Sequence, residues 1–194
     1  MPTRVALALT TLVICAAAAV FGVWLAQGDD GAPVTGWQGA LRPPGARLPD
    51  FTLADQDGEK VTAASLRGRP AVFAFVYSTC KDICPAQVQS IRGALDQLGH
   101  DVPVMGVSVD PANDTPARAR AFLLEQSMTG RMKFLLGTRR ELEPLWTAFG
   151  IAPQRKGRDH SSYTVVVDAR GRQRIGFPAS ELTPSRLAAD LARL

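Results

Sequence analysis

The chain has 194 residues, 46% of them hydrophobic, which is enough for one domain of ordinary size with a core of its own. Its formal net charge is +4, from 22 Lys and Arg residues against 18 Asp and Glu residues, and the basic residues are spread along the chain. Proteins that bind nucleic acid usually gather such residues on one face or stripe. The composition therefore predicts neither a second domain nor a nucleic-acid partner.

The first element in chain order is a predicted membrane anchor. Residues 5–26 form an almost unbroken apolar run, matching the ~20 residues that a helix needs to cross a bilayer. Arg4 precedes the run and Asp29 follows it, so the positive-inside tendency keeps the N-terminus cytoplasmic and exports the rest. A cleaved signal peptide is the alternative, although its apolar stretch usually has only ~7–15 residues. We predict a single-pass protein of the inner membrane, with its domain in the periplasm of a Gram-negative cell.

A flexible tether is predicted after the anchor. Residues 28–49 are rich in Gly, Pro and Ala and show no apolar period. The expected organisation is therefore an anchor at 1–27, a tether at 28–49 and a folded domain at 50–194. The domain is expected to open with a small hairpin, because apolar residues at 51–53 and 61–62 flank the turn residues Asp57 and Gly58.

Strand and helix patterns then alternate. Residues 71–77 and 102–109 are continuous apolar runs, as is typical of strands covered on both faces. Helical periods, with Pro near a start or Gly after an end, predict helices at 85–98, 114–126, 141–149 and 183–194. Apolar runs further predict a short apolar piece at 134–136 and strands at 163–167 and 173–177. This order predicts an α/β thioredoxin-like fold, in which helices flank a central mixed β-sheet and one transmembrane helix precedes the domain.

Two cysteines mark the point where the first central strand gives way to a helix. Cys80 and Cys84 lie at the edge where open α/β sheets place their ligands. The amide groups and dipole at a helix start stabilise thiolates. If the helix is already formed at Cys80, the two side chains share one face, close enough to hold a metal or to form a disulfide. A purely structural disulfide would stabilise the chain little, because the loop that it closes is short.

His160 is the third candidate. It precedes the strand at 163–167, which this topology runs antiparallel to the strand at 71–77, so that the start of one meets the end of the other. Two thiolates and an imidazole suit Cu(I) and can also hold Cu(II). A closed zinc site usually needs four Cys or His ligands. The only other candidate in the exported part is His100, expected at the surface of the opposite edge, so copper fits better.

Three runs of residues make the sequence resemble the Sco/SenC family of copper proteins over residues 50–194. They are Tyr77-Ser78-Thr79-Cys80-x-x-x-Cys84-Pro85, then Ser108-Val109-Asp110-Pro111 with Asp114-Thr115-Pro116, and Asp159-His160-Ser161. The resemblance implies that Cys80, Cys84 and His160 bind one copper ion. It also implies a role in assembling the copper A centre of cytochrome c oxidase, with the oxidase subunit as client and a periplasmic copper donor or thiol reductant as further partner. A departure is Lys81, where the family usually has Pro.

An alternative function is thiol-disulfide exchange on exported or oxidase-subunit proteins, with Cys80 and Cys84 as the redox pair. The resemblance implies this activity too, beside a main role as a metallochaperone. Ordinary thioredoxins have Cys-x-x-Cys and a Pro before the late strand, whereas here the spacing is one residue longer and Ser161 and Ser162 stand in that place. A peroxidase is not expected, because the sequence around Cys80 lacks the peroxidase pattern. A copper-dependent redox sensor is a third possible function, but no residue in the sequence distinguishes it from the other two.

Four acidic residues near these motifs have simpler explanations than metal binding. Asp110 and Asp114 are expected as a strand-end turn residue and a helix cap. Asp82 and Asp159 are expected either to accept a hydrogen bond from a ligand residue or to be solvated.

Overall fold

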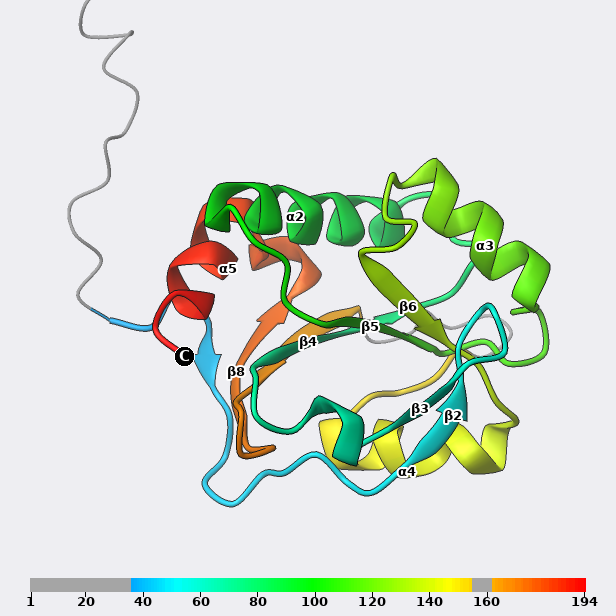
Figure 1. Cartoon of the computed structure of the whole chain (residues 1–194), viewed down its shortest axis with the longest axis horizontal. Helices are drawn as coiled ribbons and strands as arrows, with labels where there is room; N and C mark the ends of the chain where they lie inside the picture. The colour runs from blue at the N-terminus through cyan, green and yellow to red at the C-terminus, as the bar shows by residue number, and fades with distance from the viewer. Residues whose placement is uncertain (1–35, 155–161) are drawn as a thin grey trace, which may run out of the picture. The chain divides into compact units, whose positions relative to one another are not determined.

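A six-stranded mixed sheet forms the centre of the domain (Figure 1). The computed structural model describes residues 36–154 and 162–194. In the order β1-β8-β7-β4-β5-β6, strands β4, β5 and β6 run parallel and the other neighbours pair antiparallel. The strands are β1 (Ala40–Leu41), β4 (Ala71–Val76), β5 (Val104–Ser108), β6 (Met132–Leu135), β7 (Tyr163–Val167) and β8 (Gln173–Pro178). The predicted mixed α/β sheet is confirmed, and the first two residues of the short apolar piece at 134–136 belong to β6, its third parallel strand.

Strand β4 explains why its apolar run shows no alternation. All six of its residues are buried. Val72, Ala74 and Val76 join the core on one face of the sheet, whereas Phe73 and Phe75 join the core on the other. Because successive side chains of a strand point to opposite faces, a strand covered on both sides needs apolar residues at every position.

Helices cover both faces of the sheet (Figure 1). The first core contains residues of α2 (Ile83–Leu98), α3 (Pro116–Glu125) and α5 (Pro184–Leu191). The second contains residues of α4 (Arg139–Phe149), the 3-10 turn η1 (Ala64–Leu66) and the hairpin of β2 (Thr52–Ala54) and β3 (Lys60–Thr62). A second 3-10 turn, η2 (Ala179–Glu181), precedes α5. The predicted hairpin and helices are confirmed, with bounds that differ by a few residues.

The predicted tether is partly wrong, because its later residues belong to the folded domain. Ala40 and Leu41 pair with Gly176 and Ile175 of β8, although the Leu41 side chain is 67% exposed. The backbone N–H groups of Gln38 and Gly39 donate to the carboxylate of Asp190, at 2.8 and 2.9 Å. Backbone hydrogen bonds therefore hold this segment, and an analysis based on apolar periodicity does not detect them. Residues 28–35 lie outside the described residues.

The predicted membrane anchor is not tested by the structure. Residues 5–26 fall outside the described part of the chain. Within residues 36–154 and 162–194, no helix is both long enough and apolar enough to cross a bilayer.

A buried aspartate in the β7–β8 turn predicts acid sensitivity of the fold. Asp168 accepts hydrogen bonds from the backbone N–H groups of Arg170 and Arg172 and from the Arg172 side chain, at 2.8–2.9 Å. Burial by itself raises the pKa of Asp168, but these bonds outweigh it and hold the pKa below its ordinary value of 3.8. A carboxylate with a depressed folded-state pKa stabilises the fold above its unfolded pKa, and this contribution is lost as the pH falls through the folded-state pKa.

We therefore expect the free energy of unfolding, measured by urea titration, to fall as the pH drops below about 3.8. Asp168→Asn should cost about 1.5–3 kcal/mol at neutral pH, because it removes hydrogen bonds to a charged group. The variant should also lose part of the acid dependence. A variant with the same acid profile as the wild type would contradict this role of Asp168.

Candidate metal and thiol site

Cys80 and Cys84 lie on either side of a helix start. Cys80 belongs to the loop after β4, and α2 begins only at Ile83. The condition for a shared helix face, a helix already formed at Cys80, is therefore not met. The backbone N–H of Cys84 donates to the Cys80 sulfur, with 3.2 Å between nitrogen and sulfur. The Asp82 side chain makes no capping hydrogen bond at this helix start. The Cys80 sulfur therefore acts as the N-cap acceptor in place of a side-chain oxygen. It accepts from one of the first N–H groups of the helix, which have no partner within the helix.

The two sulfurs differ in acidity. Cys80 is 7% exposed and Cys84 is fully buried, and both are thiols. Burial raises the pKa of the Cys80 thiol, but hydrogen bonds from the Cys84 side chain and from the Asp82 and Cys84 backbones outweigh it, so that the pKa is lowered overall. Burial and the neighbouring Cys80 sulfur raise the pKa of Cys84. Cys80 is thus the more acidic thiol of the pair, and Cys84 is the one that holds its proton more tightly.

Asp114 contacts the loop after β4, which contains Cys80, instead of capping a helix. The cap of α3 is Thr115, whose side chain accepts from the Arg118 N–H, so the predicted cap lies one residue too early. The Asp114 carboxylate accepts hydrogen bonds from Ser78, in the loop after β4, and from Ser108, at the end of β5. Burial raises the pKa of Asp114, and the hydrogen bonds from both serines oppose that rise.

The start of β7 lies beside the first turns of α2. The Gln87 side-chain amide donates to the Tyr163 carbonyl at 3.0 Å and to the Thr164 hydroxyl at 2.8 Å. Gln87 follows Cys84 by three residues, about one helical turn. Thr164 pairs with Ala74 of β4, which confirms the predicted antiparallel arrangement. The first residues of β7 are therefore close to the helix turn that contains Cys84.

His160 itself lies outside the described residues. It precedes Tyr163 by three residues, a length of chain that spans at most ~11 Å. On the other side of the undescribed segment, the Gln154 N–H donates to the carbonyl of Val109, directly after β5, at 2.9 Å. The described residues on both sides of 155–161 are thus tied to the edge of the sheet that carries Cys80.

The other candidates are not at this edge or have no metal contact. His100 is exposed just after the far end of α2, with its Nδ1 atom 3.2 Å from the Leu98 carbonyl, as predicted. Asp110 accepts from the Asn113 side chain in a turn, which agrees with its predicted role. Asp82 is exposed and Asp159 lies outside the described residues. Among the described residues, no three His, Cys, Asp or Glu side chains gather to hold a metal ion.

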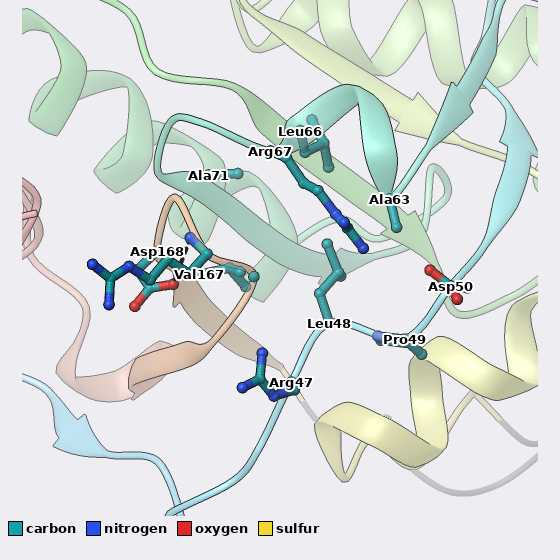
Figure 2. A pocket seen from close by; sticks show the side chains of 12 residues that line it. Arg47, Leu48, Pro49, Asp50, Ala63, Leu66, Arg67, Ala71, Val167 and Asp168 are labelled. Atoms are coloured by element: carbon teal, nitrogen blue, oxygen red, sulfur yellow. Dashed lines mark hydrogen bonds between the residues drawn. The ribbon is translucent and has the colours of Figure 1, made fainter.

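A cavity elsewhere in the fold is separate from the cysteine pair. It has a volume of about 330 Å³, and Figure 2 shows Arg47, Leu48 and Arg67 among the side chains that line it. Ala71, the first residue of β4, and Val167, the last residue of β7, also line it. Because Cys80 follows the other end of β4, the cavity lies at the opposite edge of the sheet. The candidate metal site is therefore distinct from this cavity.

A family model described as SCO1/SenC matches residues 40–194. The chain belongs to the SCO1/SenC family. Copper-bound ScoI of Bradyrhizobium japonicum is 33% identical, with a TM-score of 0.64 over 76% of this chain and 99% of that one. BsSco, described as a Sco-family cytochrome c oxidase assembly protein with a disulfide switch, is 26% identical, with a TM-score of 0.68 over 79% of this chain and 96% of that one. The SCO2-like protein RC0895 of Rickettsia conorii is 27% identical over 135 residues, 63% of this chain and 65% of that protein.

Two residues near the site were missed or misassigned from the sequence. Asp114 belongs to a run that supported the resemblance to the Sco/SenC family, so a signal existed, but only the fold connects its carboxylate to Ser78. Gln87 gave no signal, because a single buried polar residue inside an amphipathic helix does not change the helical pattern.

Removing the Gln87 side chain should weaken the contact between α2 and β7. Gln87 is 1% exposed, and no hydrogen-bond partner is found for its Oε1 atom among the described residues. Gln87→Leu leaves the Tyr163 carbonyl and the Thr164 hydroxyl without their donor, which should cost about 1–3 kcal/mol of unfolding free energy in urea titration.

The matched control is Gln89→Leu on the same helix. Gln89 is only half-buried and bonds to Gln126, so its replacement should cost less than about 1 kcal/mol. Equal losses in the two variants would show that the Gln87 contact adds nothing specific.

Proposed function

We propose that this SCO1/SenC protein is a copper-binding assembly factor that delivers copper to, or prepares, the copper A site of cytochrome c oxidase. Cys80, Cys84 and His160 hold one copper ion as cargo. The observation that carries the proposal is the contact between the Cys84 N–H and the Cys80 sulfur, which keeps two sulfurs together at a helix start. The copper-bound ScoI relative, which is 33% identical, supports the choice of metal.

The chemistry of the pair suits reversible copper binding. A thiolate is the form that binds metal, and the lowered pKa of Cys80 makes its thiol the easier of the two to ionise. Cys84 releases its proton when copper binds, because the metal competes with the proton for the sulfur. Two soft sulfurs with one imidazole match Cu(I), and the imidazole also accommodates Cu(II).

The location and the partners belong to the same proposal. A domain held by an inner-membrane helix at 5–26, on the periplasmic side, would face the exported copper A domain of the oxidase subunit. A periplasmic copper donor would load the site, and a thiol reductant would keep Cys80 and Cys84 reduced. The family match and the description of the BsSco relative support the link to the oxidase.

Copper binding by His160 variants tests the proposal. The reduced full-length chain should bind about one equivalent of copper, and His160→Ala should lower the affinity by more than about 100-fold, since even changes to the partners of a ligand cost 10–100-fold. His100→Ala is the matched control and should bind like the wild type, because His100 is exposed at the far end of α2. Competition with a copper chelator measures both. A His160→Ala chain that binds as tightly as the wild type removes His160 from the site.

A second candidate is thiol-disulfide exchange, and the unequal acidity of the two cysteines favours it. The Cys80 thiolate would attack a client disulfide, and Cys84 would then close the Cys80–Cys84 disulfide while the client leaves with two thiols. Turnover of a client disulfide with copper chelated separates this function from the first. Rapid turnover by the copper-free chain would make exchange the main activity.

A further inference from the structure

We propose that Asp114 is a positioning residue of the cysteine site, because its carboxylate fixes the turn that carries Cys80. Asp114 lies between β5 and α3, more than thirty residues after Cys80. It is 9% exposed, so its carboxylate must find donors inside the protein. All the donors recorded for that carboxylate lie at the edge of the sheet where the two cysteines sit.

Three hydrogen bonds join Asp114 to two loops. Its Oδ1 atom accepts from the Ser78 backbone N–H at 2.7 Å and from the Ser78 hydroxyl at 2.5 Å. Its Oδ2 atom accepts from the Ser108 hydroxyl at 2.5 Å. Bonds to a carboxylate are shorter and about twice as strong as bonds between neutral groups. Ser78, two residues before Cys80, is thus held through both its backbone and its side chain.

A short chain of contacts leads from Ser78 to the sulfur. The Cys80 N–H donates to the Tyr77 carbonyl at 3.2 Å, so residues 77–80 form one closed turn. The Cys80 sulfur then accepts the Cys84 N–H at the start of α2. Ser78 and Thr79 are the only residues inside this turn, so fixing Ser78 leaves the chain few ways to move Cys80. The position of the sulfur therefore depends on the Asp114 contact.

The other end of the contact is a rigid part of the sheet. Ser108 is fully buried and pairs with Val76 of β4. Its carbonyl accepts the Trp146 indole N–H at 3.0 Å, and the next residue, Val109, donates to the Val76 carbonyl at 3.0 Å. Asp114 thus ties the loop after β4 to the buried end of β5. Such a tie keeps a binding loop in its competent conformation, and affinity falls in proportion to the fraction of chains that leave it.

Asp168 provides a matched control, since it is also a buried aspartate that braces a turn. It is 7% exposed and accepts bonds from Arg170 and Arg172 in the β7–β8 turn. That turn lies at the opposite edge of the sheet from Cys80. If Asp114 only stabilises the fold, Asp114→Ala and Asp168→Ala should have the same kinds of effect.

Copper affinity of the full-length reduced chain is the first measurement, and this arm rests on the proposed function. Asp114→Ala should weaken copper binding by about 10-fold or more, because it removes hydrogen bonds to a charged group. Asp114→Asn should restore most of the affinity, since its amide oxygen still accepts from Ser78. Asp168→Ala should lower the melting temperature without changing the affinity. An Asp114→Ala chain with wild-type affinity, in a protein that does bind copper, would overturn the inference.

Amide hydrogen exchange in the metal-free chain is the second measurement, and it does not depend on copper. The Cys84 amide reports directly on the sulfur, because it donates to Cys80. Asp114→Ala should speed its exchange about 10-fold more than that of Val165, a buried residue of β7. Equal acceleration at both amides would show a general loss of stability and overturn the inference, whether or not copper binds.

Ser108→Ala keeps the inference testable if Asp114→Ala does not fold. It removes one donor to Asp114 and leaves both Ser78 bonds in place. The exchange rate of the Cys84 amide should rise about 3- to 10-fold, which corresponds to the free energy of one hydrogen bond between neutral groups. The exchange rate of the Val165 amide should stay near that of the wild type. Unchanged exchange at Cys84 would overturn the inference.

Discussion

Replacing either Cys80 or Cys84 with serine is expected to abolish copper binding to the reduced full-length chain. A serine hydroxyl is a hard, weakly acidic ligand, whereas Cu(I) prefers soft thiolates, so each change removes one of the two sulfur ligands. Copper content after gel filtration should fall from about one equivalent to a trace in both variants. We expect the Cys80→Ser chain also to lose part of its cap on α2, since the Cys84 N–H donates to the Cys80 sulfur.

The third cysteine supplies a matched control for this experiment. Cys15 lies in the apolar run at 5–26 and has no assigned chemical role, so Cys15→Ser should bind copper like the wild type. Full copper content in Cys80→Ser or Cys84→Ser would contradict the proposed ligand set. Loss of copper in Cys15→Ser would bring the N-terminal segment into the site instead.

Phe149→Ala is expected to cause a large loss of stability without removing copper binding. Phe149 is 1% exposed at the end of α4, with its ring centroid 5.1 Å from that of Phe73 and 5.2 Å from that of Phe75. Truncating a buried phenylalanine costs about 3–5 kcal/mol, because it loses apolar burial and leaves a cavity. For a chain of this length the melting temperature should fall by about 10 °C.

Copper content and an exposed leucine complete this test. Below its melting temperature Phe149→Ala should still bind copper, because α4 packs in the core on one face of β4 and α2 in the core on the other. Leu124→Ala is the control for side-chain size, since Leu124 is 71% exposed and its loss should change stability by less than about 0.5 kcal/mol. A Phe149→Ala chain as stable as the wild type would mean that this core tolerates the cavity.

Much of the site could be predicted from the sequence, because it depends on where elements begin and end. Cys80 follows a buried strand and Cys84 precedes a helical period, so both were expected at one edge of the sheet. The antiparallel pairing of β7 with β4 was also expected from the order of the elements. The actual helix start at Ile83 was not, because it depends on which group satisfies the first N–H groups of the helix.

The sequence by itself determined the element order, the mixed sheet, the two-sided burial of β4 and the position of the cysteine pair, since apolar periodicity and turn residues are local signals. Only the tertiary structure decided the pairing of β1 with β8, the Gln87 contact to β7 and the bond between Asp114 and Ser78. These contacts join polar or backbone groups that are 36 or more residues apart in the chain. They produce no periodic pattern in the sequence, so only the folded structure shows which donor bonds to which acceptor.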